Sequence, residues 1–178
     1  SDNHNSGLIE PLIYQVIFNK IRAYQADRLL SSKYVTPKDM SGHRYAFFPL
    51  HTEPEVSQLL YGRPFVNQLE LVRIIAFSLP ADMTLIIKEH PWMIGKRKIS
   101  TYKKFLNIPR VCFANPSISA REFIVESDLV TVLTSSVGLE ATILGKPVLT
   151  FGHVPFNILS ESMVKKATDL TQLSSIII

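Results

Sequence analysis

The sequence predicts an α/β fold, a Rossmann-like parallel sheet of five strands in the order 3-2-1-4-5 with helices on both faces. Short runs rich in aromatic and branched apolar residues recur from residue 44 onward. Segments with helical periodicity separate these runs, so each strand can return in parallel through a right-handed crossover. The 178 residues have the length of one domain, and 46% of them are apolar, which suffices for a sizeable core.

A long helix and a connector are expected before the sheet. Apolar residues recur at helical offsets over residues 8–30, so one face of this helix is expected to be buried. Residues 31–43 are polar and contain a proline and a glycine, which predicts a connector. We therefore divide the chain into residues 1–43, the helix with its connector, and residues 44–178, the Rossmann-like domain.

Each predicted strand is a short apolar run, and each predicted helix has helical periodicity or recognisable ends. In chain order the strands are Tyr45 to Leu50, Thr84 to Lys88, Val111 to Ala114, Leu129 to Leu133 and Pro147 to Phe151. The helices are Gln68 to Leu79, Ser100 to Leu106, Ser119 to Glu126, Val137 to Leu144 and Asp169 to Ser174. Ser119 and Glu122 have the spacing of a capping box, which marks where the third of these helices begins.

Charge and composition argue against several classes of function. The net charge of +4 is only mildly basic, and without a basic arm or an RNA-binding signature no nucleic-acid partner is expected. The five histidines are scattered, so we expect neither a metal nor another cofactor. No apolar run approaches the roughly 20 residues that span a bilayer. Cys112 is the single cysteine, which fits a reducing cytoplasm.

Polar residues gather where the predicted strands end. His51 and Glu53 follow the first strand, Glu89-His90-Pro91 follow the second, and Thr134-Ser135-Ser136 follow the fourth. Carboxyl ends of parallel strands form one edge of a sheet, and ligands bind there at the switch point between strands 1 and 4. We therefore expect the site at this edge, with His51 as a possible substrate contact.

The segment from Thr134 to Gly138 joins a strand to a helix and has two compatible interpretations. Serine is a preferred N-cap, so capping alone explains Ser135 and Ser136. The same backbone N–H groups, hydroxyls and helix dipole can hold a phosphate, with Gly138 allowing the backbone to approach closely. One helical turn later, Glu140 either forms a solvated face or a local ion pair, or accepts hydrogen bonds from ribose hydroxyls.

His90 and Glu53 are the two candidate catalytic residues. A protonated His90 can pair with a phosphate and give it a proton as it departs, whereas the simpler alternative is a histidine that packs or caps. Pro91 restricts the backbone of the residue before it. Glu53 could act as acid or base near an acceptor, or it could be a solvated loop residue. Lys96 and Arg97 are possible substrate contacts or members of a basic loop.

Three stretches resemble the capsule polysaccharide biosynthesis family over about residues 44 to 160: "FFPLHTEPE", "KEHPWMIGKR" and "NPSISAREFIVESDLVTVLTSSVGLEATILGKPVLTFG". That family includes transferases that use CMP-Kdo as the donor. The same residues look like the nucleotide-binding half of a GT-B glycosyltransferase. Bacterial sialyltransferases of that type direct a His-Pro motif and a Ser-Ser motif at the CMP phosphate, and His90-Pro91 and Ser135-Ser136 match these motifs. The resemblance therefore implies a CMP-sugar donor, with Glu140 at its ribose.

The resemblance implies that residues 44–178 bind a nucleotide sugar for a cytoplasmic glycosyltransferase of capsular or surface polysaccharide, either free in the cytoplasm or peripheral to the inner membrane. The acceptor would be a glycan or a glycolipid. We expect an excised part of a longer protein, inactive alone, because the N-terminal GT-B half and the acidic sialyltransferase motif are missing from these residues. Two alternatives remain open, an enzyme like UDP-GlcNAc 2-epimerase and a non-catalytic binding module of a capsule assembly complex.

Overall fold

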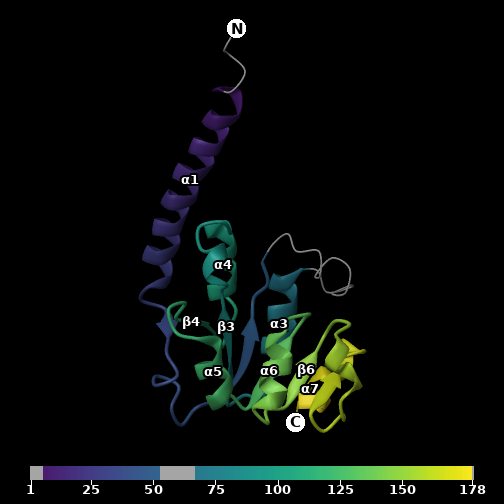
Figure 1. Ribbon diagram of the computed structural model, residues 1–178. Coiled ribbons are helices and arrows are strands. Elements are labelled where there is room, and N and C mark those ends of the chain that lie inside the picture. The colour runs from purple at the N-terminus through teal and green to yellow at the C-terminus, as the bar shows by residue number, and fades with distance from the viewer. Residues whose placement is uncertain (1–5, 53–66, 178) are drawn as a thin grey trace.

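The computed structural model describes residues 6–52 and 67–177, with side chains from residue 14 onward. Over these residues a sheet forms the centre, with helices packed around it (Figure 1). It has seven parallel strands in the order β1-β4-β3-β2-β5-β6-β7. The strands are β1 Tyr34–Val35, β2 Arg44–Pro49, β3 Met83–Lys88, β4 Val111–Ala114, β5 Leu129–Val132, β6 Val148–Thr150 and β7 Val164–Lys166.

The five predicted strands correspond to β2 through β6, and their predicted order is confirmed. The predicted count of five was wrong, because β1 and β7 each add one strand at an edge. β1 lies in the segment expected to be a connector, where Tyr34 pairs with Phe113 of β4. With two and three residues, these edge strands are too short to produce a recognisable alternation of apolar and polar residues.

Helices cover both faces of the sheet, as predicted. They are α1 Ser6–Leu30, α3 Gln68–Ser78, α4 Ile99–Leu106, α5 Ala120–Glu126, α6 Val137–Ile143 and α7 Leu173–Ile177, with short 3₁₀ helices η1 Pro91–Met93, η2 Pro155–Ile158 and η3 Leu170–Gln172. Alternate residues of β2 enter two separate cores. Phe48 packs in the core that includes residues of α3 and α4, and Phe47 packs in the core of α5 and α6. The predicted capping box of Ser119 and Glu122 is present at the start of α5.

α1 extends well beyond the sheet (Figure 1). The prediction of a buried face was wrong for most of its described side chains, since Tyr14, Phe18 and Ile21 are exposed and Tyr24 is 67% exposed. Near the end of the helix, Ala26 enters the core, as does Leu30. The helical spacing of apolar residues predicted that this helix has an apolar face, but it could not predict whether another segment covers that face.

Gly95 fixes the contact between α1 and the loop after η1. Its φ of +85° is a conformation that glycine adopts without strain. A Cβ added there would lie 2.5 Å from the backbone oxygen of Asn19 and 2.7 Å from the Cβ of Ala23, so α1 can only approach this closely beside a glycine.

Among the helices of residues 6–52 and 67–177, none is long and apolar enough to cross a membrane.

Candidate functional site

Two cavities open at the carboxyl edge of the sheet, and the loop Thr134–Ser136 contributes to both. The first, of about 400 Å³, lies at the ends of β2, β3 and β5 and is lined by His90 and Ser135 among others. The second, of about 450 Å³, is lined by Thr134 and Ser136 and by the segment Val154–Leu159. The loop therefore separates the two cavities, which we call the His90 cavity and the Phe156 cavity.

His90 caps the short helix η1. Its Nδ1 accepts a hydrogen bond from the backbone N–H of Trp92 at 3.2 Å, and Pro91 begins the helix. Because a backbone N–H can only donate, Nδ1 carries no proton in this conformation, and the neutral ring holds its proton on Nε2. His90 thus offers Nε2–H as a hydrogen-bond donor toward a ligand, the role that the sequence suggested for this ring.

Ser135 and Ser136 have different surroundings. Ser135 Oγ accepts the N–H of Val137 at 3.2 Å and so caps the first turn of α6, which leaves its hydroxyl proton for another acceptor. Ser136 makes no side-chain cap hydrogen bond and lines the Phe156 cavity. Ser135 and His90 therefore share a property: each accepts one backbone hydrogen bond and keeps its own proton to donate.

A buried carboxylate holds the backbone of His90 in place. Glu89 is 4% exposed, and its Oε1 accepts the N–H of His90 at 3.1 Å. Its Oε2 accepts from Arg97 Nε at 2.7 Å and from the hydroxyl of Tyr102 at 3.1 Å. Burial, with the nearby Glu89 charge, raises the pKa of Tyr102 above its ordinary value, so this hydroxyl keeps its proton. Arg97, 5% exposed, is engaged inside the protein by this pair.

His51 extends this network to the other strands. Its backbone N–H donates to Gln68 Oε1 at 2.7 Å, and its carbonyl accepts from Gln68 Nε2 and from Arg97 Nη2. Its buried side chain accepts the N–H of Thr134 at Nε2, at 3.3 Å. Hydrogen bonds therefore run from the end of β3 through the end of β2 to the loop after β5, and they set the two walls of the His90 cavity relative to each other.

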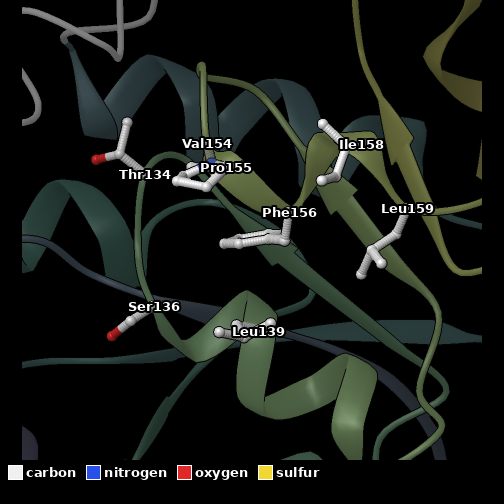
Figure 2. Close-up of a pocket in the computed structure, with 8 residues that line it drawn as sticks. All are labelled: Thr134, Ser136, Leu139, Val154, Pro155, Phe156, Ile158 and Leu159. Atoms are coloured by element: carbon white, nitrogen blue, oxygen red, sulfur yellow. The ribbon is translucent and has the colours of Figure 1, made fainter.

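The Phe156 cavity is almost entirely apolar (Figure 2). Figure 2 shows Thr134 and Ser136 on one side of it and Ile158 and Leu159 on the other. Thr134 Oγ1 is buried and has no hydrogen-bond partner in the described part of the chain. A Cβ on Gly138 would lie 2.7 Å from the ring of Phe156, so this glycine makes room for the wall of the cavity.

The Gly138→Ala variant is expected to lose about 1–2 kcal/mol of folding free energy, because its methyl group would force the ring of Phe156 and the side chain of Val132 to shift. Urea denaturation of both proteins measures this loss. Combining Gly138→Ala with Phe156→Leu should cost less than the sum of the single changes, since the smaller side chain relieves the overlap. Strict additivity would show that the ring does not set the requirement for glycine.

A family model described as "Capsule polysaccharide biosynthesis protein" matches residues 4–166 of this chain. The chain belongs to the capsule polysaccharide biosynthesis family. This match confirms the resemblance found in the sequence, and it extends beyond the stretches that suggested it to include α1 and β1.

This member of the capsule polysaccharide biosynthesis family is shorter than one curated relative, protein FixF. Protein FixF of Sinorhizobium fredii (strain NBRC 101917 / NGR234) is 30% identical over 148 residues, which cover 82% of this chain and 35% of FixF. The chain therefore spans about a third of that relative.

Solved structures share the fold. The β-Kdo 2,7 transferase of Thermosulfurimonas dismutans KpsC matches with a TM-score of 0.52 and 19% identity, over 92% of this chain and 57% of that one. The β-Kdo 2,4 transferase of the same KpsC has a TM-score of 0.57 and 17% identity, over 76% and 44%. A proposed UDP-N-acetylglucosamine 2-epimerase of Listeria monocytogenes has a TM-score of 0.52 and 20% identity, over 78% and 36%. These matches agree with the predicted fold, one Rossmann-like half of a GT-B arrangement.

The remaining predicted residues of this capsule-family chain lie outside the two cavities or outside the described residues. Glu140 forms a 3.8 Å ion pair with Arg121 at the surface and lines neither cavity. Lys96 lies over the exposed ring of Trp92, 3.6 Å from its centroid. Glu53 lies outside the described residues. Over residues 6–52 and 67–177, no cluster of histidine, cysteine and acidic residues could hold a metal ion.

Lys88 is a cavity residue that we did not anticipate from the sequence, where it only marked the end of a strand. It lines the His90 cavity, and its Nζ donates to the backbone oxygens of Asn115 and Pro116, both at 3.1 Å. Strand geometry offered a signal, because residues two apart on an extended chain point to the same side. Lys88 and His90 have this spacing at the end of β3.

Proposed function

We propose that this chain is the donor-nucleotide part of a glycosyltransferase for capsular or surface polysaccharide that uses a CMP-activated sugar such as CMP-Kdo. The observation that carries the proposal is the cavity of about 400 Å³ that brings His90 and Ser135 together. It opens at the carboxyl ends of the neighbouring strands β2 and β5, where the strand order reverses and such sheets bind ligands. Its volume lies in the range of roughly 300–1,000 Å³ that is typical of small-ligand sites.

The two donors suit the chemistry of this transfer. An acceptor hydroxyl attacks the anomeric carbon, the bond from that carbon to the phosphate oxygen breaks, and its electron pair stays on the departing CMP. Negative charge therefore grows on the phosphate, where the Nε2–H of His90 and the hydroxyl of Ser135 would stabilise it. Donors that are already oriented toward developing charge usually make the largest contribution to catalysis.

Other residues take supporting roles in this proposal. Glu140 lines neither cavity, so it would accept hydrogen bonds from the ribose only where the nucleotide extends beyond the His90 cavity. Glu53 would take the proton of the acceptor hydroxyl. His51 and Arg97 would act from behind the cavity wall, by fixing the backbone of Thr134 and the carboxylate of Glu89. The acceptor would be a glycan or a glycolipid presented at the cytoplasmic face of a membrane, and no metal or other cofactor is required. The complete activity would belong to the whole protein.

The fold shared with the Listeria protein favours one second candidate, an enzyme of the UDP-GlcNAc 2-epimerase type. Both candidates place a nucleotide phosphate in the His90 cavity, so they differ in the base and in the number of phosphates. A preference for UDP would favour the second candidate, and a preference for CMP would favour the first.

Among CMP, CDP, UMP, UDP and GDP, CMP is expected to raise the melting temperature of the chain most. At a concentration of 100 times its dissociation constant, a ligand of the native state stabilises it by about 2.7 kcal/mol, which corresponds to roughly 5–10 °C for a chain of this size. Differential scanning fluorimetry measures the shifts, with cytidine as the control without phosphate. A larger shift with UDP would contradict the CMP donor, and no shift with any nucleotide would contradict both candidates. Nucleotide binding without turnover in the full-length protein would favour a non-catalytic binding module.

A further inference from the structure

We propose that Lys88 is the electrostatic anchor of the His90 cavity and binds an anionic phosphate oxygen of the ligand. The identity of that ligand as a nucleotide rests on the proposed function, whereas the anion site itself rests on the contacts of Lys88. The sequence resemblance assigned the phosphate to the His-Pro and Ser-Ser motifs, and it gave Lys88 no role.

Within the described residues, Lys88 is a buried cation that forms no ion pair. The residue is 8% exposed, and the two recorded partners of its Nζ are neutral backbone carbonyls. Among the residues that the structure describes, no carboxylate forms an ion pair with it. The neighbouring Glu89 is paired with Arg97, and Glu122 acts on Lys88 only from a longer distance while it completes the capping box of α5.

A cation in this position is costly for the empty protein. Removing a charge from water is unfavourable unless an opposite charge compensates for it, and two carbonyl dipoles supply only part of that compensation. Burial accordingly lowers the pKa of the Lys88 ammonium. An ammonium has three N–H donors, and two of them reach Asn115 and Pro116. The third has no acceptor in the part of the chain that the structure describes, so it can donate to a ligand.

Three kinds of donor then surround one cavity. The ammonium of Lys88 and the ring of His90 come from the end of β3, and the hydroxyl of Ser135 comes from the loop after β5. A tetrahedral phosphate has several oxygens that can accept from such a set at once. Lys88 would supply the positive charge, while the Nε2–H of His90 and the hydroxyl of Ser135 would donate hydrogen bonds.

Lys88→Met and Lys88→Arg test this role, because methionine removes the charge at similar length and arginine keeps it. Lys88→Met is expected to raise the dissociation constants of CMP and of inorganic phosphate at least about tenfold, and that of cytidine hardly at all. Lys88→Arg should retain most of the affinity. Calorimetric titration of the three proteins with these ligands, and with free Kdo as a carboxylate without phosphate, measures the effects. Binding of Kdo that depends on Lys88, without binding of phosphate, would overturn the assignment to phosphate.

Stability separates this role from a purely structural one. If Lys88 only fastens the turn at Asn115, Lys88→Met should unfold at lower urea while the folded protein binds CMP as before, and that result would overturn the proposal. If Lys88 binds the anion, the ligand-free variant should be at least as stable as the wild type, because a buried unpaired charge is gone.

A measurement on the wild-type chain covers the case in which Lys88→Met does not fold. The side-chain NMR signal of Lys88, assigned by its absence from Lys88→Arg, should shift on addition of CMP or inorganic phosphate and stay in place with cytidine. A signal that stays in place at saturating CMP would refute the proposal. Inorganic phosphate that moves this signal while no nucleotide binds would leave the anion site standing and would refute the nucleotide donor.

Discussion

Arg97→Met is expected to lower the free energy of unfolding by about 3–5 kcal/mol. The guanidinium of Arg97 is the partner of the buried carboxylate of Glu89 and also donates to the carbonyl of His51. Methionine would fill much of the same space, but it would leave the Glu89 charge without a counter-ion away from water. Urea denaturation followed by circular dichroism measures the difference.

Lys96→Met is the matched control for this prediction, since it removes the neighbouring positive charge at the surface. Lys96 contacts only the exposed face of Trp92 among its recorded partners, so its loss should cost no more than about 1 kcal/mol. The double variant Glu89→Gln, Arg97→Met should be more stable than Arg97→Met alone, because the unpaired charge is gone. Similar small losses for Arg97→Met and Lys96→Met would show that the buried pair does not hold this edge together.

His90→Ala is expected to weaken CMP binding by roughly 1–3 kcal/mol, about fivefold to 160-fold. In the whole protein it should also lower kcat by about 10²–10³, the cost of removing one donor aimed at developing negative charge. The reason is the loss of the Nε2–H that the cap on η1 leaves for the ligand. Calorimetric titration of CMP and cytidine measures the first effect, and single-turnover kinetics with CMP-Kdo measures the second.

The His90→Asn variant distinguishes the role of His90 in ligand binding from its role as the cap of η1. Asparagine can accept the N–H of Trp92 as the histidine does, yet it has no group at the position of Nε2. Both variants should therefore lose CMP affinity, whereas only His90→Ala should lose the stability contributed by the cap, about 1 kcal/mol. Equal losses for CMP and cytidine, or no loss for either, would remove His90 from the ligand site.

The central fold could be predicted because each of the five strands from β2 to β6 lies in a distinct apolar run. β1 and β7 were missed because Tyr34–Val35 offers only two residues and because two of the three residues in Val164–Lys166 are lysines. For α1, the helical spacing of the apolar residues correctly predicted a helix. The assumption that its apolar face is covered failed, because a pattern of residues contains no information about a neighbour.

The site was predictable only as an edge of the sheet. The rule for parallel strands brought His90 and Ser135 together, and the structure places both on one cavity. The separation of Ser136 into the other cavity depends on the turn geometry of the loop, which residue types alone do not determine. Arg97 was expected either to contact substrate or to lie in a basic loop, and its burial in an ion pair with Glu89 could not be read from residue types alone.

The two short edge strands also limit how this sheet can associate with other chains. An exposed strand edge offers unpaired backbone N–H and C=O groups on which a foreign strand can assemble. Without β1 and β7, those edges would be β4 and β6, two largely apolar strands of the sheet. In the described structure the two edges are formed by β1, which has two residues, and by β7, which has three residues, two of them lysines. Short edge strands and lysine side chains both disfavour pairing with a foreign strand, so β1 and β7 are expected to reduce edge-to-edge aggregation of this sheet.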